Sequence, residues 1–351
     1  MRQFVLRSRY YYSCLSEVEK RIYREIYNCW ASGDTEAEII LPGTGFELPT
    51  GMSLFQLVGY IIEENPQLFH LETAQLYYTR MGTTVTIRAD AVYSQSEYWE
   101  IYGKLLDRVD HILKMTDDCH TEYDKLLFLH DYLAENITFD IPGDDSRSAR
   151  ESHTIVGALL RGACVCDGYA RAYRLLCDQM HISCTVMIGK STESGNEEAH
   201  AWNLVKINGS VYHVDVTWDS RLITDSRFMP DYYFLRSDDL FAKDHVWDAA
   251  LYPPAPEDYP REECTVSSKW EFEQSVCAKL RAGIQTVKIQ FADSFLKTYE
   301  LGTLLNGVTS RNPGVFTGIG RFDHVFFRDI NYAMIRFIKR GENGDGTGES
   351  V

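Results

Sequence analysis

One cysteine near the middle of the chain, Cys166, has the sequence surroundings of a thiol nucleophile. It lies within Gly162–Ala170, and the apolar residues around and after it share one face of a predicted helix: Tyr169, Tyr173, Leu176 and Met180. Cys166 is therefore expected at or just before a helix N-terminus, where unpaired N–H groups and the helix dipole favour the thiolate over the thiol. The same amides could hold a developing oxyanion. Because most free cysteines are small core residues, this position alone does not establish catalysis.

A hairpin downstream of Cys166 is predicted by its turn residues. An Asn-Gly pair at 208–209 separates two β-rich runs, 199–207 and 210–219. Both central residues of a type I′ turn need a positive φ, which Asn and Gly tolerate. A two-residue loop pairs Ile207 with Ser210, and this fixes the register of the strands on either side.

His200 and Asp215 are the base and the orienting carboxylate that this register brings together. Counting back from the turn pairs Trp202 with Asp215, and His200 lies two residues further along the same face, at a Cβ separation of about 7–8 Å or less. An imidazole bonded to a carboxylate is held in one tautomer and stabilised when cationic, as a base beside a thiol requires. Asp215 lies between Val214 and Val216, where an unpartnered carboxylate is costly. The alternatives, a solvated strand-end histidine and an edge carboxylate, are therefore less favoured.

In these motifs the chain resembles the transglutaminase-like superfamily, in particular its bacterial members of the cysteine-protease type. The resemblance rests on three motifs in order, Ala-Cys-Val-Cys-Asp-Gly-Tyr-Ala at 163–170, His-Ala-Trp-Asn at 200–203 and Tyr-His-Val-Asp-Val-Thr-Trp-Asp at 212–219, and covers roughly 120–259. It implies that Cys166 is the nucleophile, His200 the general base and acid, and Asp215 the orienter, which agrees with the hairpin argument. It also implies that four residues support the site or line its groove: Tyr169, Trp202, Trp218 and Asp219.

The resemblance further implies an α+β fold with a papain-like transglutaminase core, in which the helix that carries the nucleophile packs on an antiparallel sheet. Around this core at 117–260, the sequence pattern predicts an N-terminal α/β region at 1–116 and a C-terminal α/β region at 261–340. Both outer regions run helix, Pro break and two strands. Either the second region repeats the first or both use a common pattern. The Gly-rich, acidic tail at 341–351 is predicted to be disordered.

The complete Cys-His-Asp set predicts an enzyme that forms a thioester with a peptide or protein amide. Hydrolysis of that thioester, as by a cysteine protease or amidase, is the preferred interpretation. The first alternative is resolution by an amine, which would make the chain a protein-glutamine amine transferase (transglutaminase). The second is a non-catalytic interaction module. The outer regions are expected to position substrate or to dock a protein partner.

No cofactor and no metal are expected. The alternative of a metal site in the central region is disfavoured, because its cysteines and histidines do not have the spacing of a usual zinc arrangement: Cys164, Cys166, Cys177, Cys184, His181 and His200.

Four neighbours of the site are interpreted as structural. Cys164 stands where the resembling proteins usually have a small or apolar residue. A reversible disulfide with Cys166 is the alternative, disfavoured because the ring would be small and strained. His130 and His153 have no carboxylate at a recognisable spacing, and His213 is interpreted as a packing residue on the Asp215 face.

The composition argues against several classes of partner. Asp and Glu number 51 against 35 Lys and Arg, so the 351-residue chain carries a net charge of −16. That charge would repel both a nucleic-acid backbone and an anionic membrane surface. The first twelve residues lack the apolar core of a signal peptide, so a cytoplasmic location is expected. Nine scattered cysteines do not suggest a disulfide scaffold and are expected to be mostly reduced.

Overall fold

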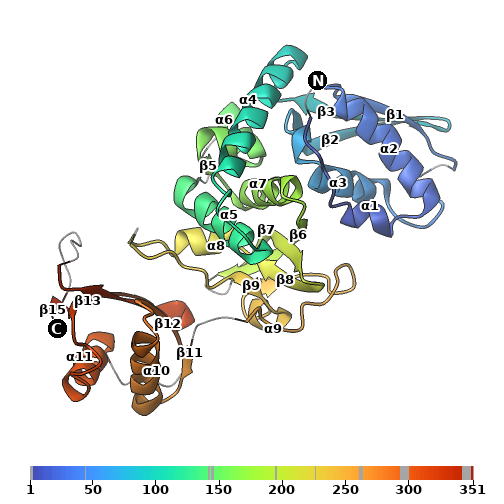
Figure 1. Ribbon diagram of the computed structural model, residues 1–351. Helices are drawn as coiled ribbons and strands as arrows, with labels where there is room; N and C mark the ends of the chain where they lie inside the picture. Colours follow the sequence, from blue (N-terminus) through green and yellow to red (C-terminus); the bar gives the residue numbers. More distant parts are fainter. Residues whose placement is uncertain are drawn as a thin grey trace. The chain divides into compact units, whose positions relative to one another are not determined.

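The computed structural model (Figure 1) describes residues 3–43, 45–140, 143, 146–193, 196–225, 227–260, 264–292, 300–341 and 349–350. The chain mixes helices and sheets, as the predicted α+β class requires. It separates into two compact units, one formed by Met1–Arg221 with Tyr233–Tyr259 and the other by Leu222–Tyr232 with Pro260–Val351. The finer division of the first unit near residue 116 stays a prediction.

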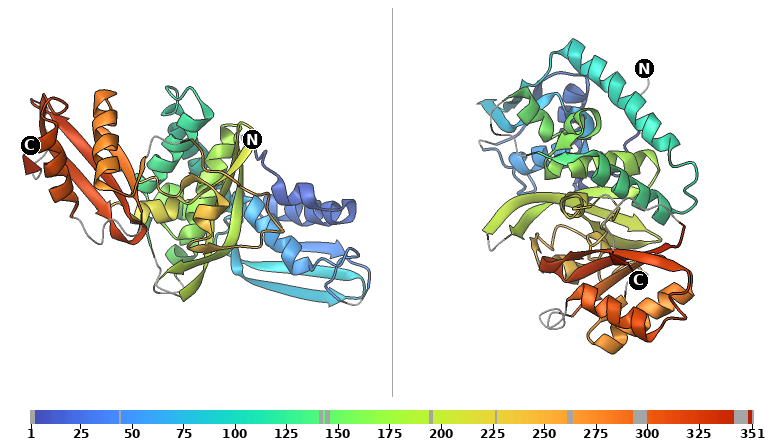
Figure 2. Two further views of the ribbon diagram at one scale, coloured as in Figure 1. Left: turned by 90° about the horizontal axis from the view of Figure 1, so that it is seen from below. Right: turned by 90° about the vertical axis from the view of Figure 1, so that its left-hand side faces the viewer.

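An antiparallel five-stranded sheet forms the centre of the first unit. Its order is β10-β6-β7-β8-β9. Helix α7 (Cys166–Gln179) packs directly against β6 and β7, and α5 (Glu122–Asn136) packs against α7. Figures 1 and 2 show both helices on the same face of this sheet. The strand bounds are β6 Ser183–Glu193, β7 Asn196–Ile207, β8 Ser210–Val214, β9 Phe234–Arg236 and β10 His245–Val246.

Helix α7 is covered on nearly every side, and every residue from Gly168 to Asp178 is buried. The tyrosines predicted on its apolar face, Tyr169 and Tyr173, are 1% and 0% exposed. Its opposite side carries two buried arginines, and Arg171 Nη2 lies 2.8 Å from Glu63 Oε1 of α3. Burying a charge is costly unless it is paired, so this ion pair fixes α7 against the N-terminal region.

The N-terminal part of the first unit is a three-stranded antiparallel sheet of order β1-β3-β2 with helices packed on it. Ser16 and Ser94 begin α2 and α4 with capping boxes, in which each serine bonds a glutamate three residues later. The bounds are α1 Tyr10–Cys14, α2 Glu17–Ala31, β1 Glu36–Ile40, α3 Leu54–Glu64, η1 Pro66–Leu68, β2 Leu71–Met81, β3 Thr84–Ala91 and α4 Gln95–Lys114.

The remaining short elements of the first unit lie between α5 and α7 or follow strands of the central sheet. A two-stranded parallel pair, β4 with β5, precedes α7 directly, and a single π-helical turn, η2, precedes β5. The bounds are β4 Thr138–Phe139, α6 Arg147–Ser152, η2 Gly157–Arg161, β5 Ala163–Cys164, α8 Val216–Arg221 and α9 Asp238–Phe241.

The second unit is a five-stranded sheet of order β11-β12-β14-β13-β15, with α10 and α11 on one face (Figures 1 and 2). The order β12-β14-β13 matches the order β1-β3-β2 of the N-terminal sheet. In both regions the chain runs helix, strand, helix and then a two-stranded hairpin. Duplication of one region from the other stays a prediction. The bounds are β11 Cys264–Val266, α10 Lys269–Arg281, β12 Thr286–Phe291, α11 Leu301–Arg311, β13 Ile319–Phe327, η3 Arg328–Ile330, β14 Tyr332–Lys339 and β15 Glu349–Ser350.

Two predictions concern the end of the chain and the membrane. Most of the tail predicted to be disordered, 342–348 and 351, lies outside the described residues, whereas Glu349–Ser350 pair with β13. Among the described helices, none combines the length and the apolar character that a membrane crossing needs.

Candidate active site

Cys166 is the first residue of α7, as its sequence surroundings predict. Val165 precedes it in an extended conformation and contributes no capping side chain, while its N–H donates to the Ser152 carbonyl at 3.0 Å. The first amides of a helix have no partner within the helix. In α7 the Gly168 N–H donates to Asp167 Oδ1 at 3.0 Å, so the N–H groups of Cys166 and Asp167 are the donors that the positive end of the dipole offers beside the half-buried thiol.

The turn into α7 depends on a close approach between Gly168 and Cys164. A methyl group on Gly168 would lie 2.6 Å from Cys164 Cβ and 2.6 Å from the Ser152 carbonyl oxygen. Cys164 is 0% exposed, and burial raises the pKa of its thiol far above the ordinary value. Cys164 and Cys166 are both free thiols in this structure.

Replacing Gly168 with alanine is expected to lower the free energy of unfolding by about 1–3 kcal/mol, because neither backbone nor Cys164 can yield without distorting the start of α7. Thermal denaturation of the two proteins measures this. Gly103→Ala is the matched control, since Gly103 is also helical and a methyl group there meets nothing within 4 Å. The control should keep or raise the melting temperature. Equal melting temperatures for Gly168→Ala and the wild type would contradict the close approach.

The hairpin β7–β8 has the predicted turn and register. Ile207 pairs with Ser210, and Asn208 and Gly209 have φ values of 52° and 88°. The ladder ends one pair earlier than predicted, with Asn203 opposite Val214, so the pairing of Trp202 with Asp215 does not form. The parity of the two strands is unaffected by this, and it is parity that decides which side chains share a face.

Asp215 differs from the expectation of a strand residue, because it lies between the end of β8 and the start of α8. Its Oδ1 accepts the Trp218 N–H at 3.1 Å, as the cap of a short helix would, and its own N–H donates to the Tyr233 carbonyl at 3.0 Å. These bonds fix the direction of the carboxylate and leave Oδ2 to face the sheet.

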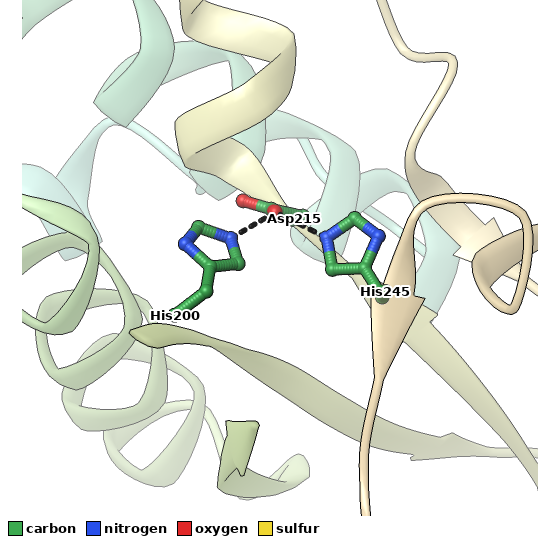
Figure 3. Close-up of side chains that lie close together, drawn as sticks. All are labelled: His200, Asp215 and His245. Atoms are coloured by element: carbon green, nitrogen blue, oxygen red, sulfur yellow. Dashed lines mark hydrogen bonds and ion pairs between the residues drawn. The ribbon is translucent and has the colours of Figure 1, made fainter. Parts of the chain in front are cut away.

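His200 lies on β7 and bonds to that oxygen, with 2.7 Å between His200 Nε2 and Asp215 Oδ2 (Figure 3). Burial lowers the pKa of His200, but the Asp215 carboxylate outweighs it and the pKa rises to about 10. Burial likewise disfavours the charged form of Asp215, yet His200 and a second histidine hold its pKa well below the ordinary value. The pair is therefore an imidazolium bonded to a carboxylate.

The Cys166 thiol is close enough to the His200 ring to raise the pKa of that ring as well. Because Asp215 occupies Nε2, Nδ1 is the nitrogen left for the thiol. Cys166 packs against Ala170, Val186 and Ala201, two of which belong to β6 and β7. The structure thus brings the three residues predicted from the sequence to one place.

Asn203 is a further link between the base and the nucleophile that sequence reasoning did not single out. Its Nδ2 donates to the Ala170 carbonyl at 2.9 Å, and it is 1% exposed. This bond ties β7, which carries His200, to the N-terminal half of α7, which begins with Cys166. Asn203 is the last residue of the His-Ala-Trp-Asn motif, so the sequence contained it within a recognised motif but gave it no role.

His245 lies directly at the site, although sequence reasoning included it in the region of resemblance without giving it a role. Its Nε2 is 3.1 Å from Asp215 Oδ2, and its Nδ1 is 2.6 Å from Asp244 Oδ1. Figure 3 shows the two imidazoles on either side of the carboxylate. His245 is separated from Asp215 by 30 residues and lies on a strand of two residues, so no periodicity could relate it to the site.

Trp202 and Trp218 are the two predicted supporting residues that approach the His200 ring. Trp202 is 1% exposed, its ring plane lies at 19° to that of His200, and the centroids are 5.9 Å apart. The Trp218 centroid is 6.0 Å from His200 and 4.6 Å from His245. Aromatic rings packed around an imidazole limit its rotation and exclude water from its face.

His213 holds Trp202 in place. Trp202 Nε1 donates to His213 Nδ1 at 3.0 Å, and His213 Nε2 lies 2.8 Å from Asp238 Oδ1. Burial, opposed by Asp238, lowers the pKa of His213 to about 4, so the ring is neutral. It thus contacts the site through Trp202, in keeping with its interpretation as a packing residue.

Asp219 and Tyr169, the other two predicted supporting residues, hold the backbone around the site. Asp219 Oδ2 accepts the Tyr233 N–H and lies 3.0 Å from His130 Nε2. Tyr169 donates its hydroxyl to the Ile137 carbonyl at 2.6 Å. Both therefore position elements next to the site.

His130 and His153, for which the sequence shows no carboxylate at a recognisable spacing, both have carboxylate partners. His130 lies between Asp131 Oδ1 at 2.8 Å and Asp219 Oδ2 at 3.0 Å. Although burial opposes the charge, these two carboxylates raise its pKa to about 10. His153 Nδ1 lies 3.1 Å from Asp167. The Asp219 and Asp167 contacts are tertiary, so sequence spacing could not reveal them.

Within the part of the chain that the structure describes, side-chain atoms that could bind a metal ion cluster in a single place. His200, Asp215 and His245 bring one ligand atom each to within 4.8 Å of one another. Both ring nitrogens already face Asp215 Oδ2, so an ion would have to displace these bonds. That no metal is needed stays a prediction.

Comparison with known proteins finds a family match over the region of the chain that holds the three predicted residues. Residues 111–216 match the model of the transglutaminase-like superfamily, a range that contains Cys166, His200 and Asp215 and ends before His245. The kyphoscoliosis peptidase of Mus musculus is 26% identical over 147 residues, 38% of this chain and 22% of the mouse protein. The Homo sapiens protein is 27% identical over 171 residues, 44% of this chain and 26% of the human protein. The chain thus spans about a quarter of each relative.

Two solved structures also resemble the chain. A candidate cysteine protease from Cytophaga hutchinsonii is 14% identical, with a TM-score of 0.28, over 41% of this chain and 61% of that one. A structure described as a TGase is 15% identical, with a TM-score of 0.30, over 66% of this chain and 59% of that one.

Proposed function

Because residues 111–216 carry a transglutaminase-like core, we propose that this chain is a cysteine protease or related amide hydrolase that works through a thioester. The observation that carries the proposal is the ordered series Cys166, His200 and Asp215, in which the base bonds the carboxylate at 2.7 Å and the thiol lies beside its ring. The substrate we propose is a peptide or protein amide.

The reaction uses these groups in sequence. The Cys166 thiolate attacks the amide carbonyl carbon, and the resulting oxyanion is held by amides at the start of α7. The His200 imidazolium gives its proton to the departing amine, which leaves a thioester on Cys166 and a neutral imidazole. That imidazole then takes a proton from water, whose oxygen attacks the thioester. Collapse of the second tetrahedral intermediate breaks the carbon–sulfur bond, releases the carboxylic acid and leaves the Cys166 thiolate beside the His200 imidazolium, which restores the enzyme.

Hydrolysis is preferred over amine transfer because the curated relatives are named peptidases. The same thioester would pass its acyl group to a primary amine if one reached it before water. A labelled amine offered with a glutamine-containing protein separates the two reactions. New chain ends or released ammonia without incorporation would support the hydrolase, whereas incorporation of the amine would identify a transferase.

Selective alkylation by iodoacetamide near pH 6 tests the activated thiol without a known substrate. An ordinary cysteine is almost wholly protonated at this pH, so Cys166 should react about tenfold or more faster than the others if it is a thiolate. Cys14 is the internal control, since it is exposed whereas Cys166 is half-buried. Peptide mass spectrometry after timed labelling gives both rates.

His200→Ala should remove this advantage, because the imidazolium that stabilises the thiolate is gone. The protein must still show the wild-type circular dichroism spectrum. If Cys166 labels no faster than Cys14 in the wild type, the proposed thiol chemistry is wrong and the non-catalytic alternative gains support.

A further inference from the structure

The orienting carboxylate of the proposed site serves two imidazoles rather than one. Asp215 Oδ2 lies 2.7 Å from His200 Nε2 and 3.1 Å from His245 Nε2 (Figure 3). Its other oxygen accepts the Trp218 N–H at 3.1 Å. A carboxylate that accepts three hydrogen bonds in a buried site is firmly oriented and strongly stabilised as an anion.

His245 is held as a cation by its partners. Its Nδ1 lies 2.6 Å from Asp244 Oδ1, while its Nε2 faces Asp215. A carboxylate oxygen only accepts hydrogen bonds, so a ring between two carboxylates donates from both nitrogens. Asp244 is itself kept an acceptor by the Tyr233 hydroxyl, which donates to its Oδ2 at 2.7 Å. Burial lowers the pKa of His245, but Asp215 and Asp244 outweigh burial and raise it.

We propose that His245 is a positioning residue whose buried positive charge sets the proton affinity of His200 through the Asp215 oxygen that they share. This inference rests on the proposed function, since it concerns the base of that reaction. Without His245 the full charge of Asp215 would act on His200 alone and hold its proton more tightly. With His245 in place, His200 gives up its proton more readily to a departing amine.

The surroundings of His245 support an electrostatic role. The charged or titratable groups that face it are Asp215 and Asp244 on the attractive side and His200, with a ring centroid 5.4 Å away, on the repulsive side. His213 interacts with it and is neutral near pH 7. The other neighbours are aromatic and limit access of water to the ring: Trp202, Trp218, Tyr233 and Phe241. The interaction is thus screened less than one at the surface.

The test is the pH dependence of Cys166 alkylation by iodoacetamide in the wild type and in His245→Gln, with short pulses between pH 4 and pH 11. Glutamine can still donate a hydrogen bond to Asp215 but carries no charge. Loss of the cation should move the inflection at which His200 loses its proton upward by about one pH unit. A ring that only fills space would leave this inflection in place.

Asp244→Asn provides a second variant that keeps the histidine. It removes the negative charge that stabilises the proton on Nδ1, although the amide oxygen can still accept a hydrogen bond, so the same upward shift is expected. Imidazole nitrogen NMR adds a direct readout, in which His245 should carry protons on both nitrogens at pH 7 in the wild type and lose one in Asp244→Asn.

His130→Gln is the matched control, because it also removes a buried imidazolium held between two carboxylates. It should lower the melting temperature and leave the inflection where it is. A reactive wild-type Cys166 whose profile is unchanged in both His245→Gln and Asp244→Asn would overturn the role of His245 alone. A wild-type Cys166 that reacts no faster than Cys14 would overturn the proposed function and this inference together.

Discussion

Replacing Cys166 with alanine is expected to reduce amide turnover to the background rate, a loss of about 10⁴- to 10⁶-fold in kcat. Without the sulfur no thioester can form, and the remaining groups can only bind the amide and polarise its carbonyl. The measurement is hydrolysis of a protein amide that the wild type cleaves, followed by mass spectrometry of the products. Because Cys166 is half-buried and its neighbours are small, alanine should cost little stability.

Cys164→Ala is the matched control for this prediction. It removes the same functional group two residues earlier, from a side chain that is fully buried against Gly168. We expect it to lower the melting temperature and to keep most of the wild-type kcat. If Cys164→Ala were inactive while Cys166→Ala still turned over, the nucleophile would be wrongly assigned. If both were fully active, hydrolysis would not pass through a thiol in this turn.

Much of the central fold followed from local sequence signals. The Asn-Gly turn fixed the β7–β8 register because Asn208 and Gly209 both adopt a positive φ. The start of α7 at Cys166 followed from the apolar spacing after it. Each of these features depends on residues close together in sequence, which is why pattern and propensity could predict them.

Most of the parts that could not be predicted depend on contacts between distant segments. His245 lies on β10, which pairs with β6 at the edge of the sheet and is separated from β8 by β6 and β7. Only this tertiary pairing brings His245 to Asp215. His130 finds Asp219 across 89 residues, through packing of α5 against α8. Asp215 was placed on a strand because its neighbours are valines, yet the strand ended at Val214 and the carboxylate became a helix cap. Contacts between distant segments decided the first two, and a local capping bond from the Trp218 N–H decided the third.

Asp215→Asn is expected to lower kcat/KM by about 10³- to 10⁴-fold while the protein still folds. Both carboxylate oxygens accept hydrogen bonds in the wild type, Oδ1 from the Trp218 N–H and Oδ2 from His200 and His245. The asparagine side chain has only one acceptor oxygen. Its NH2 group must therefore face either the Trp218 N–H or the two imidazoles, so that two donors oppose each other. The negative charge that outweighs burial and raises the pKa of His200 to about 10 is lost as well. Asp131→Asn, which changes a carboxylate beside His130 instead, should have little effect on kcat/KM.

The pH dependence of stability distinguishes this variant from a simple loss of packing. His200 has a raised pKa in the folded state, so its contribution is complete below the unfolded value of about 6.5 and disappears as the pH rises through about 10. Asp215 has a lowered pKa, so its contribution is present above about pH 4 and is lost as the pH falls further. The wild type should therefore exceed Asp215→Asn in urea midpoint most between about pH 4 and pH 6.5, with a difference that narrows at pH 8 and more so at pH 10. A difference in urea midpoint that stayed constant from pH 5 to pH 10 would mean that Asp215 stabilises the protein through its shape alone. The claim that its charge raises the pKa of the His200 base would then be wrong.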